Sequence, residues 1–225
     1  DHVRRALDQW LDEVGAGLLD HTGLVQALDE ITTNVVRHAY TGDDGFLSAG
    51  ARLEDTGRAV VTVTDHGTWA PDTPLGFGLM MAAGLADDFS VERGGAANTV
   101  ELAHELTRPV SMLQSVPDVN TPRWDDEISL QTWPGKVVAT GAVDDLAAEL
   151  FHAALNEASE AGSRTVVVDL TGASRLASPG VQSLHEFQQR GQTNSNQVDV
   201  VARRGSCVAE ILRITAVAHR LVHGQ

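Results

Sequence analysis

The sequence contains a single cysteine, Cys207. One thiol excludes an internal disulfide and any metal cage built from several cysteines. A chain without disulfides fits a reducing compartment, so we expect a cytoplasmic protein.

Long apolar segments are also missing. No apolar run approaches the roughly 18 residues that a membrane-spanning helix needs, so we expect no membrane insertion. The chain begins Asp-His-Val-Arg-Arg, without an initiator methionine and without the apolar core of a signal peptide. We therefore expect it to be a fragment of a longer protein.

Basic residues are scarce. The 16 Lys and Arg residues stand against 31 Asp and Glu residues, which leaves a formal net charge of −15. Binding of a phosphate backbone requires a basic face, so this balance argues against direct nucleic-acid binding. An acidic protein can instead compete with nucleic acid for a basic partner such as a transcription factor, and the same acidity also serves simple solubility.

The sequence does contain enough apolar residues for two small domains. Its 225 residues are 42% hydrophobic, and this length suits two domains better than one. Residues 108–123, RPVSMLQSVPDVNTPR, hold three prolines and no amphipathic period, which is typical of a linker. We therefore expect domains at residues 1–107 and 124–225.

Periodicity in the first half predicts an α+β sandwich. Apolar residues recur at helical spacing from Val3 to Val14 and again from Leu24 to Ala39, with Gly42 near the end of the second helix. Strand-like segments follow, interrupted by a loop rich in Gly and Pro and by a short helix. The strands are expected at 47–53, 59–64, 89–92 and 99–104, and the short helix at 79–86.

In the second half, strands alternate with helices. This order favours a mixed sheet covered by helices. The strands are expected at 128–133, 136–140, 165–170 and 197–202, and the helices at 144–161, 179–190 and 207–219.

The second helix carries a polar face beside its apolar stripe. At about 100° per residue, Glu30, Asn34 and Arg37 lie on one side. A carboxylate and an amide oxygen one turn apart suit a hard divalent cation, and Glu30 can also take a proton from an attacking hydroxyl. The same residues equally suit a solvated helix face.

Two glycine-containing loops follow. Asp65 comes just past a strand, where its carboxylate can accept a hydrogen bond from an exocyclic amine such as that of adenine, and Gly67 permits a close turn. Gly76 and Gly78 lead into a helix, whose free N–H groups and dipole favour phosphate. Taken singly, these patterns are a turn and a flexible loop end.

As an ordered set, Glu-x3-Asn-x3-His-Ala-Tyr, Asp-x-Gly and Gly-x-Gly-Leu-x-Met resemble the GHKL ATPase family over about residues 1–105. Within that family the stretch GFGLMMAAGLADDFSVE is most similar to the anti-sigma-factor serine kinases. The resemblance implies ATP and Mg²⁺ as cofactors. The implied roles are Glu30 as general base, Asn34 as magnesium ligand, Asp65 as adenine contact, Gly67 as base-pocket lining, Gly76 and Gly78 as phosphate cradle, and Thr99 as support for the adenine contact.

This chain departs from the family at three places. The family usually has a strand before the first helix, whereas this chain begins at the helix. The loop that would form the ATP lid, Thr68 to Leu75, is short and carries no Lys or Arg. Phosphate binding would then depend on backbone amides, Mg²⁺ and Arg37. Finally, Asn98 stands where the family usually has glycine.

Ser178 directly precedes Pro179 at a predicted helix start. Ser at N-cap with Pro at N1 is a strong capping signal, so a structural role alone would explain the pair. The surrounding segment also resembles the STAS domain of anti-sigma-factor antagonists over about residues 124–225, through the strand end 169–172, the loop end 177–180 and the corner 141–144. The resemblance implies that Ser178 is the phosphorylated serine, with Thr171 and Ser174 as lesser candidates.

The two resemblances imply a regulator of an alternative sigma factor, in which a serine kinase is fused to its STAS antagonist. Implied partners are the sigma factor, a STAS domain of the same or another chain, a second copy in a homodimer, and upstream serine phosphatase and sensor domains. The alternative is a catalytically degenerate scaffold that sequesters partners without phosphate transfer. A histidine kinase of another GHKL branch is the less favoured expectation, because no phospho-accepting helix pair precedes the domain in this fragment.

Overall fold

The computed structural model describes residues 2–39, 45–69, 74–94, 96–107, 127–193 and 196–223. The chain divides into two compact units, residues 1–121 and 122–225. The predicted linker, Gly42 and part of the predicted ATP lid lie outside the described residues.

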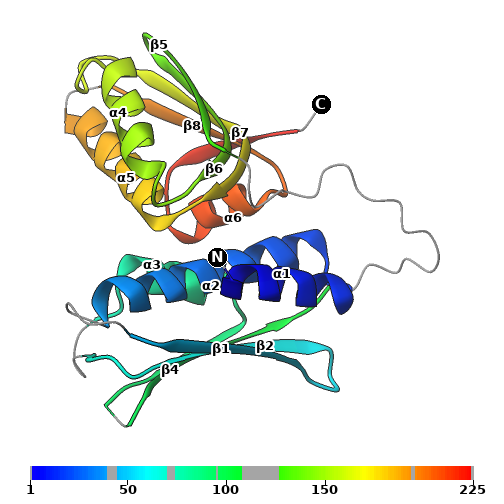
Figure 1. Ribbon diagram of the computed structural model, residues 1–225. Coiled ribbons are helices and arrows are strands. Elements are labelled where there is room, and N and C mark those ends of the chain that lie inside the picture. The colour runs from blue at the N-terminus through cyan, green and yellow to red at the C-terminus, as the bar shows by residue number, and fades with distance from the viewer. Residues whose placement is uncertain are drawn as a thin grey trace. The chain divides into compact units, whose positions relative to one another are not determined.

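The first unit is a sheet covered by helices on one face (Figure 1). Its antiparallel strands run in the order β1-β2-β4-β3. The predicted α+β sandwich is therefore confirmed. The elements are α1 (His2–Glu13), α2 (Leu18–His38), β1 (Leu47–Leu53), β2 (Arg58–Asp65), α3 (Phe77–Gly84), β3 (Asp88–Glu92) and β4 (Asn98–Glu105).

Apolar side chains of α2 and β2 form the centre of this unit. Leu24, Leu28 and Ile31 recur at helical spacing and are buried. On β2, Val61 and Val63 alternate toward the same layer and are also buried. Each such side chain contributes about 1.5–3 kcal/mol when it is fully buried. This packing fixes which side of α2 faces the sheet, and hence where its polar residues lie.

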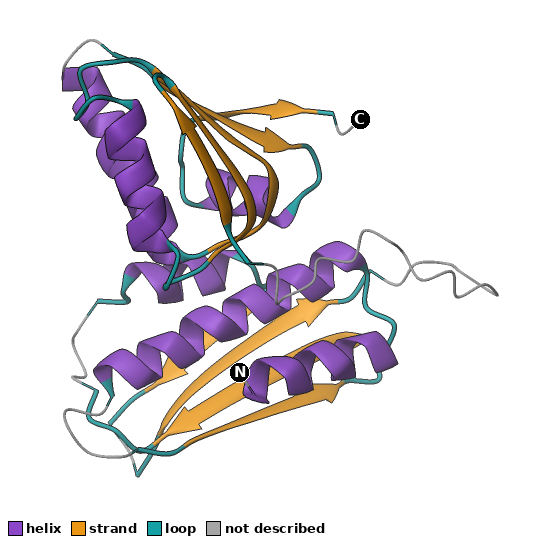
Figure 2. Ribbon diagram, turned by 45° about the horizontal axis from the view of Figure 1, so that its top comes forward, coloured by secondary structure: helices purple, strands orange, loops and turns teal. Residues whose placement is uncertain are grey.

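The second unit is a mixed sheet with order β5-β6-β7-β8-β9, flanked by helices (Figure 2). The β5–β6 pair is antiparallel, and the remaining pairs are parallel. Phe151, Leu184 and Phe187 are buried in its core. The elements are β5 (Ser129–Trp133), β6 (Lys136–Val143), α4 (Ala148–Ala158), β7 (Val166–Leu176), α5 (Ser178–Thr193), β8 (Val198–Arg203), α6 (Cys207–Ile214) and β9 (His219–Val222).

The last predicted helix, 207–219, is too long. Helix α6 ends at Ile214, and His219–Val222 forms β9, a parallel neighbour of β8. The chain leaves the helix through Ala216, whose φ of 55° lies in the left-handed region, and Val217 N–H closes the turn on the Leu212 carbonyl. A four-residue strand is too short for its period to be distinguished from a helical one.

The helix predicted from residue 144 begins four residues later, at Ala148. Asp144 instead starts a turn, in which its Oδ1 atom accepts a hydrogen bond from Ala147 N–H at 2.9 Å. An Asp side chain that bonds a nearby backbone N–H favours a turn over a helix interior. No helix among the described residues is long and apolar enough to cross a membrane.

Cys207 lies at the start of α6, and its thiol is buried. Burial, with a smaller contribution from the nearby Glu210 carboxylate, raises the pKa of Cys207 from 9.0 to about 12. We expect iodoacetamide at about pH 8 to leave the folded chain unlabelled and to label the urea-unfolded chain rapidly. Rapid labelling of the folded chain, followed by mass spectrometry, would contradict this burial.

The same shift predicts a pH dependence of stability. Because the folded-state pKa of Cys207 exceeds the unfolded value, its contribution to the free energy of unfolding is complete below pH 9.0 and is lost as the pH rises toward about 12. Replacing Cys207 with alanine should therefore flatten the decline of stability in that alkaline window.

Candidate functional site

The predicted site residues Glu30 and Asn34 lie one turn apart on the C-terminal half of α2. Glu30 is only 6% exposed, and its Oε1 atom accepts a hydrogen bond of 3.1 Å from Gln26 Nε2. Gln26 is fully buried. The carboxylate of Glu30 is thus buried, which excludes the interpretation of Glu30 as part of a solvated helix face. Arg37, one turn further along, is exposed.

Asn34 faces the start of α3. A methyl group placed on Gly76 would lie 3.9 Å from Asn34 Oδ1. Gly76 is the N-cap of α3 without a side-chain cap, and its carbonyl accepts the first helical hydrogen bond from Met80 N–H at 3.0 Å. Gly78 lies in the first turn of this helix, where N–H groups have no helical partner. An amide oxygen therefore lies near the N-terminal turn of α3, an arrangement that suits a magnesium-bound phosphate.

Asp65, the last residue of β2, is 2% exposed. Its Oδ1 atom accepts hydrogen bonds from Gly67 N–H at 2.7 Å and from Asn98 Nδ2 at 3.0 Å. Asn98 Nδ2 also donates to the Gly67 carbonyl at 2.8 Å. The turn that contains Gly67 packs against the end of α2, where Thr68 N–H donates to the Ala39 carbonyl at 2.9 Å.

Thr99 does not lie opposite Asp65 in the sheet. The strand register pairs Asp65 with Asn98 and Thr64 with Thr99. Neighbouring residues of a strand point to opposite faces, and the hydroxyls of Thr99 and Thr64 lie 3.5 Å apart on the other face of the sheet. The structure thus places Asn98, which stands where the family usually has glycine, beside the predicted adenine contact Asp65.

The segment from His66 to Trp69, which includes the start of the predicted lid, contacts residues between β3 and β4. His66 Nδ1 lies 2.9 Å from the Ala96 carbonyl oxygen, and the guanidinium carbon of Arg93 lies 5.2 Å from the centre of the Trp69 ring. This cation–π geometry brings an arginine to a lid whose own sequence has none. Residues 70–73 of the lid lie outside the described residues.

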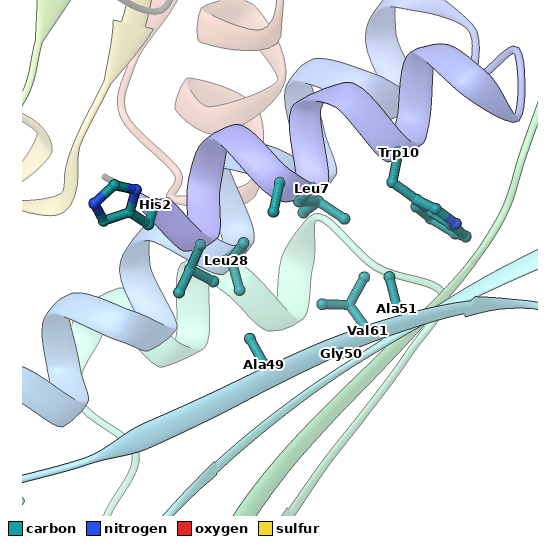
Figure 3. Close-up of a pocket in the computed structure, with 10 residues that line it drawn as sticks. His2, Leu7, Trp10, Leu28, Ala49, Gly50, Ala51 and Val61 are labelled. Carbon is teal, nitrogen blue, oxygen red and sulfur yellow. The ribbon is translucent and has the colours of Figure 1, made fainter.

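A cavity of about 390 Å³ lies elsewhere in the first unit, between α1, α2 and the edge strand β1 (Figure 3). Its lining is mostly apolar and includes His2, and none of the predicted site residues contributes to it. The cavity is therefore separate from the polar cluster. Its lining includes Leu7, Trp10, Leu28, Ala49, Ala51 and Val61.

Ser178 is half-buried at the first residue of α5. The first backbone hydrogen bond of this helix runs from Val181 N–H to the Ala177 carbonyl at 3.1 Å, so Ala177 occupies the N-cap position and the helix begins at Ser178, one residue earlier than predicted. Ala177 N–H in turn donates to the Val143 carbonyl at 2.8 Å. These bonds tie the helix start to the end of β6 and hold Ser178 on a rigid support.

The residues around the start of α5 make contacts of three kinds. The Thr171 hydroxyl donates to Asp169 Oδ1 at 2.7 Å, which engages it in its own turn. A methyl group on Gly180 would lie 2.8 Å from Leu176 Cδ1, so a larger residue there would displace the Leu176 side chain where α5 approaches β7. Beneath this helix start, buried Arg175 pairs with Asp144, with Nη2 and Oδ2 3.3 Å apart.

Comparison with known families agrees with the two units. Residues 1–104 match the model of the histidine kinase-like ATPase domain, and residues 128–223 match the model described as Mlab, STAS domain. The first unit is therefore a histidine kinase-like (GHKL) ATPase domain, and the second is a STAS domain.

Solved structures also resemble parts of the chain. The RsbU and RsbW domains of Rv1364c from Mycobacterium tuberculosis are 30% identical over 50% of this chain and 30% of that chain, with a TM-score of 0.41. The histidine kinase domain of the Erythrobacter litoralis EL346 blue-light activated histidine kinase is 20% identical over 39% of this chain and 45% of that chain, with a TM-score of 0.36. The chain thus spans less than half the length of either structure.

Proposed function

We propose that this protein regulates an alternative sigma factor, and that its ATPase domain uses Mg-ATP to phosphorylate Ser178 of a STAS domain. One observation carries the proposal. Glu30, Asn34 and the glycine-led start of α3 lie around the same half of α2, in a GHKL domain that shares its chain with a STAS domain.

The described residues fit a nucleotide. Asp65 would accept a hydrogen bond from the adenine amine. Gly67 lets the turn after Asp65 pack closely against Ala39 at the end of α2, and this turn would line the base pocket. The backbone around Gly76 and Gly78 would receive the phosphates, with Arg37 nearby on α2. Among the described residues, no group of three or more His, Cys, Asp or Glu side chains can hold a metal by itself. Asn34 would therefore bind Mg²⁺ together with the phosphates, and Mg²⁺ would neutralise their charge.

The transfer step uses Glu30 as the base. Its carboxylate takes the proton of the Ser178 hydroxyl while Ser178 Oγ forms a bond to the γ-phosphorus. The bond between that phosphorus and the oxygen of the leaving ADP breaks in the same displacement. The hydrogen bond from Gln26 fixes one oxygen of Glu30, which orients the carboxylate for this role.

Phosphorylation of Ser178 would act as a switch through charge. A phosphate adds about −1.5 to −2 charges, which the N-terminal end of a helix tolerates and a carboxylate-lined partner surface does not. The modified STAS domain would leave its partner without unfolding. The kinase domain would then bind the sigma factor, and a serine phosphatase domain upstream would reset the switch.

The acceptor serine can belong to the same chain or to a second copy in a homodimer. Linking the two domains raises their effective concentration. We propose that the protein acts in the cytoplasm, where ATP and sigma factors are present.

Isothermal titration of the chain with Mg-ADP and Mg-ATP tests the first step. We expect saturable heat and a rise in the melting temperature, because a ligand that binds only the folded state stabilises it. The absence of both would favour the binding scaffold. Incubation with labelled Mg-ATP, followed by phosphosite mapping, tests the second step. An acid-stable label on Ser178 supports the serine kinase, whereas an acid-labile phosphohistidine would contradict it.

A further inference from the structure

Asn98 holds both parts of the predicted adenine contact. It is 4% exposed at the first residue of β4, directly opposite Asp65 in the strand register. Its amide group donates to Asp65 Oδ1 at 3.0 Å and to the Gly67 carbonyl at 2.8 Å. A buried amide with two such bonds is a fixed element of the site.

These hydrogen bonds engage only one of the two oxygens of the Asp65 carboxylate. Oδ1 accepts from both Gly67 N–H and Asn98, while no described residue donates a hydrogen bond to Oδ2. Two donors on Oδ1 fix the orientation of the carboxylate. Oδ2 is therefore left as a fixed acceptor for a ligand.

We propose that Asn98 is a positioning residue that sets the preference of this site for adenine over guanine. The inference rests on the nucleotide site proposed above. Adenine presents an amine donor at the position where guanine presents a carbonyl oxygen. An ionised carboxylate accepts a hydrogen bond from the amine but repels the carbonyl, and a buried site of this kind discriminates strongly.

Removal of Asn98 would weaken this discrimination, because the Asp65 carboxylate would lose one of the two donors that orient it. Without the second donor on Oδ1, the carboxylate of Asp65 can rotate. A merely structural role predicts a different result, because a loosened turn would weaken both nucleotides by the same factor.

The test compares the dissociation constants of ADP and GDP, measured by displacement of a fluorescent mant-ADP probe from the full chain. We expect Asn98→Ala to lower the GDP-to-ADP ratio of these constants about tenfold or more. Asn98→Asp keeps the shape but replaces the amide donor with a carboxylate that cannot donate to Asp65 or to the Gly67 carbonyl, and the ratio should fall at least as far. Glu101→Gln is the control, because Glu101 lies on the same strand but bonds Arg52 and Thr62 on the opposite face.

The possible results are distinguishable. Equal weakening of both nucleotides in folded Asn98 variants would overturn the inference and leave the nucleotide site intact. If the unaltered chain binds neither nucleotide, the proposed function and this inference both fail. Circular dichroism checks folding, and if Asn98→Ala does not fold, the near-isosteric Asn98→Asp variant decides the outcome.

Discussion

Replacement of Glu30 by glutamine is expected to slow phosphate transfer to Ser178 by about 100-fold or more. Glutamine keeps the size of the side chain and its contact with Gln26, but it cannot take the proton of the attacking hydroxyl. ADP affinity should change by less than about threefold, because a general base acts in the transition state and not in nucleotide binding. The single-turnover rate of label transfer from Mg-ATP measures the first quantity, and isothermal titration measures the second.

A neighbouring carboxylate provides the matched control. Asp29 lies on the same helix and pairs with Arg4 at 3.9 Å, away from Asn34. Asp29→Asn removes the same charge and should leave the transfer rate unchanged. An unchanged rate in Glu30→Gln would reject Glu30 as the base. Label that persists in Ser178→Ala would move the acceptor elsewhere, with Ser174 as the first residue to examine.

The fold was largely predictable because most elements carry a clear period. The apolar stripe of α2 and the β-branched residues of β2 predict a helix and a half-buried strand from local sequence alone. The strand β9 was not predictable, because its four residues gain their structure only from the adjacent strand β8. Local sequence carries no signal for such a tertiary contact.

The residues of the candidate site were likewise only partly predictable from local sequence. Glu30 and Asn34 follow from the helical period, and Gly76 follows from its place before α3. Asn98 and Thr99 do not, because a shift of one residue in strand register exchanges the two faces of a sheet. Only the pairing of β4 with β2 shows that Asn98, and not Thr99, lies beside Asp65. The one available signal was an amide residue at the start of a strand.

The close approach between Gly67 and α2 gives the second large expected effect. A methyl group on Gly67 would lie 2.2 Å from the Ala39 carbonyl oxygen and 2.5 Å from Ala39 Cβ, well inside van der Waals contact. Both atoms belong to the end of α2, so relief requires the turn and the helix to separate. Separation breaks the bond from Thr68 N–H to Ala39 and displaces the Asp65–Asn98 pair.

We therefore expect Gly67→Ala to destabilise the first unit by about 2–3 kcal/mol and to weaken ADP binding at least about tenfold. Gly23→Ala is the control, because Gly23 lies within α2 and a methyl group there would meet only Leu85 Cδ2, at 4.0 Å. That variant should keep ADP affinity and gain up to about 1 kcal/mol from the higher helix propensity of alanine. Urea unfolding and ADP titration measure the two effects. Native affinity in Gly67→Ala would mean that the turn beside Asp65 can move away from α2 without loss of the nucleotide, and would remove Gly67 from the base pocket.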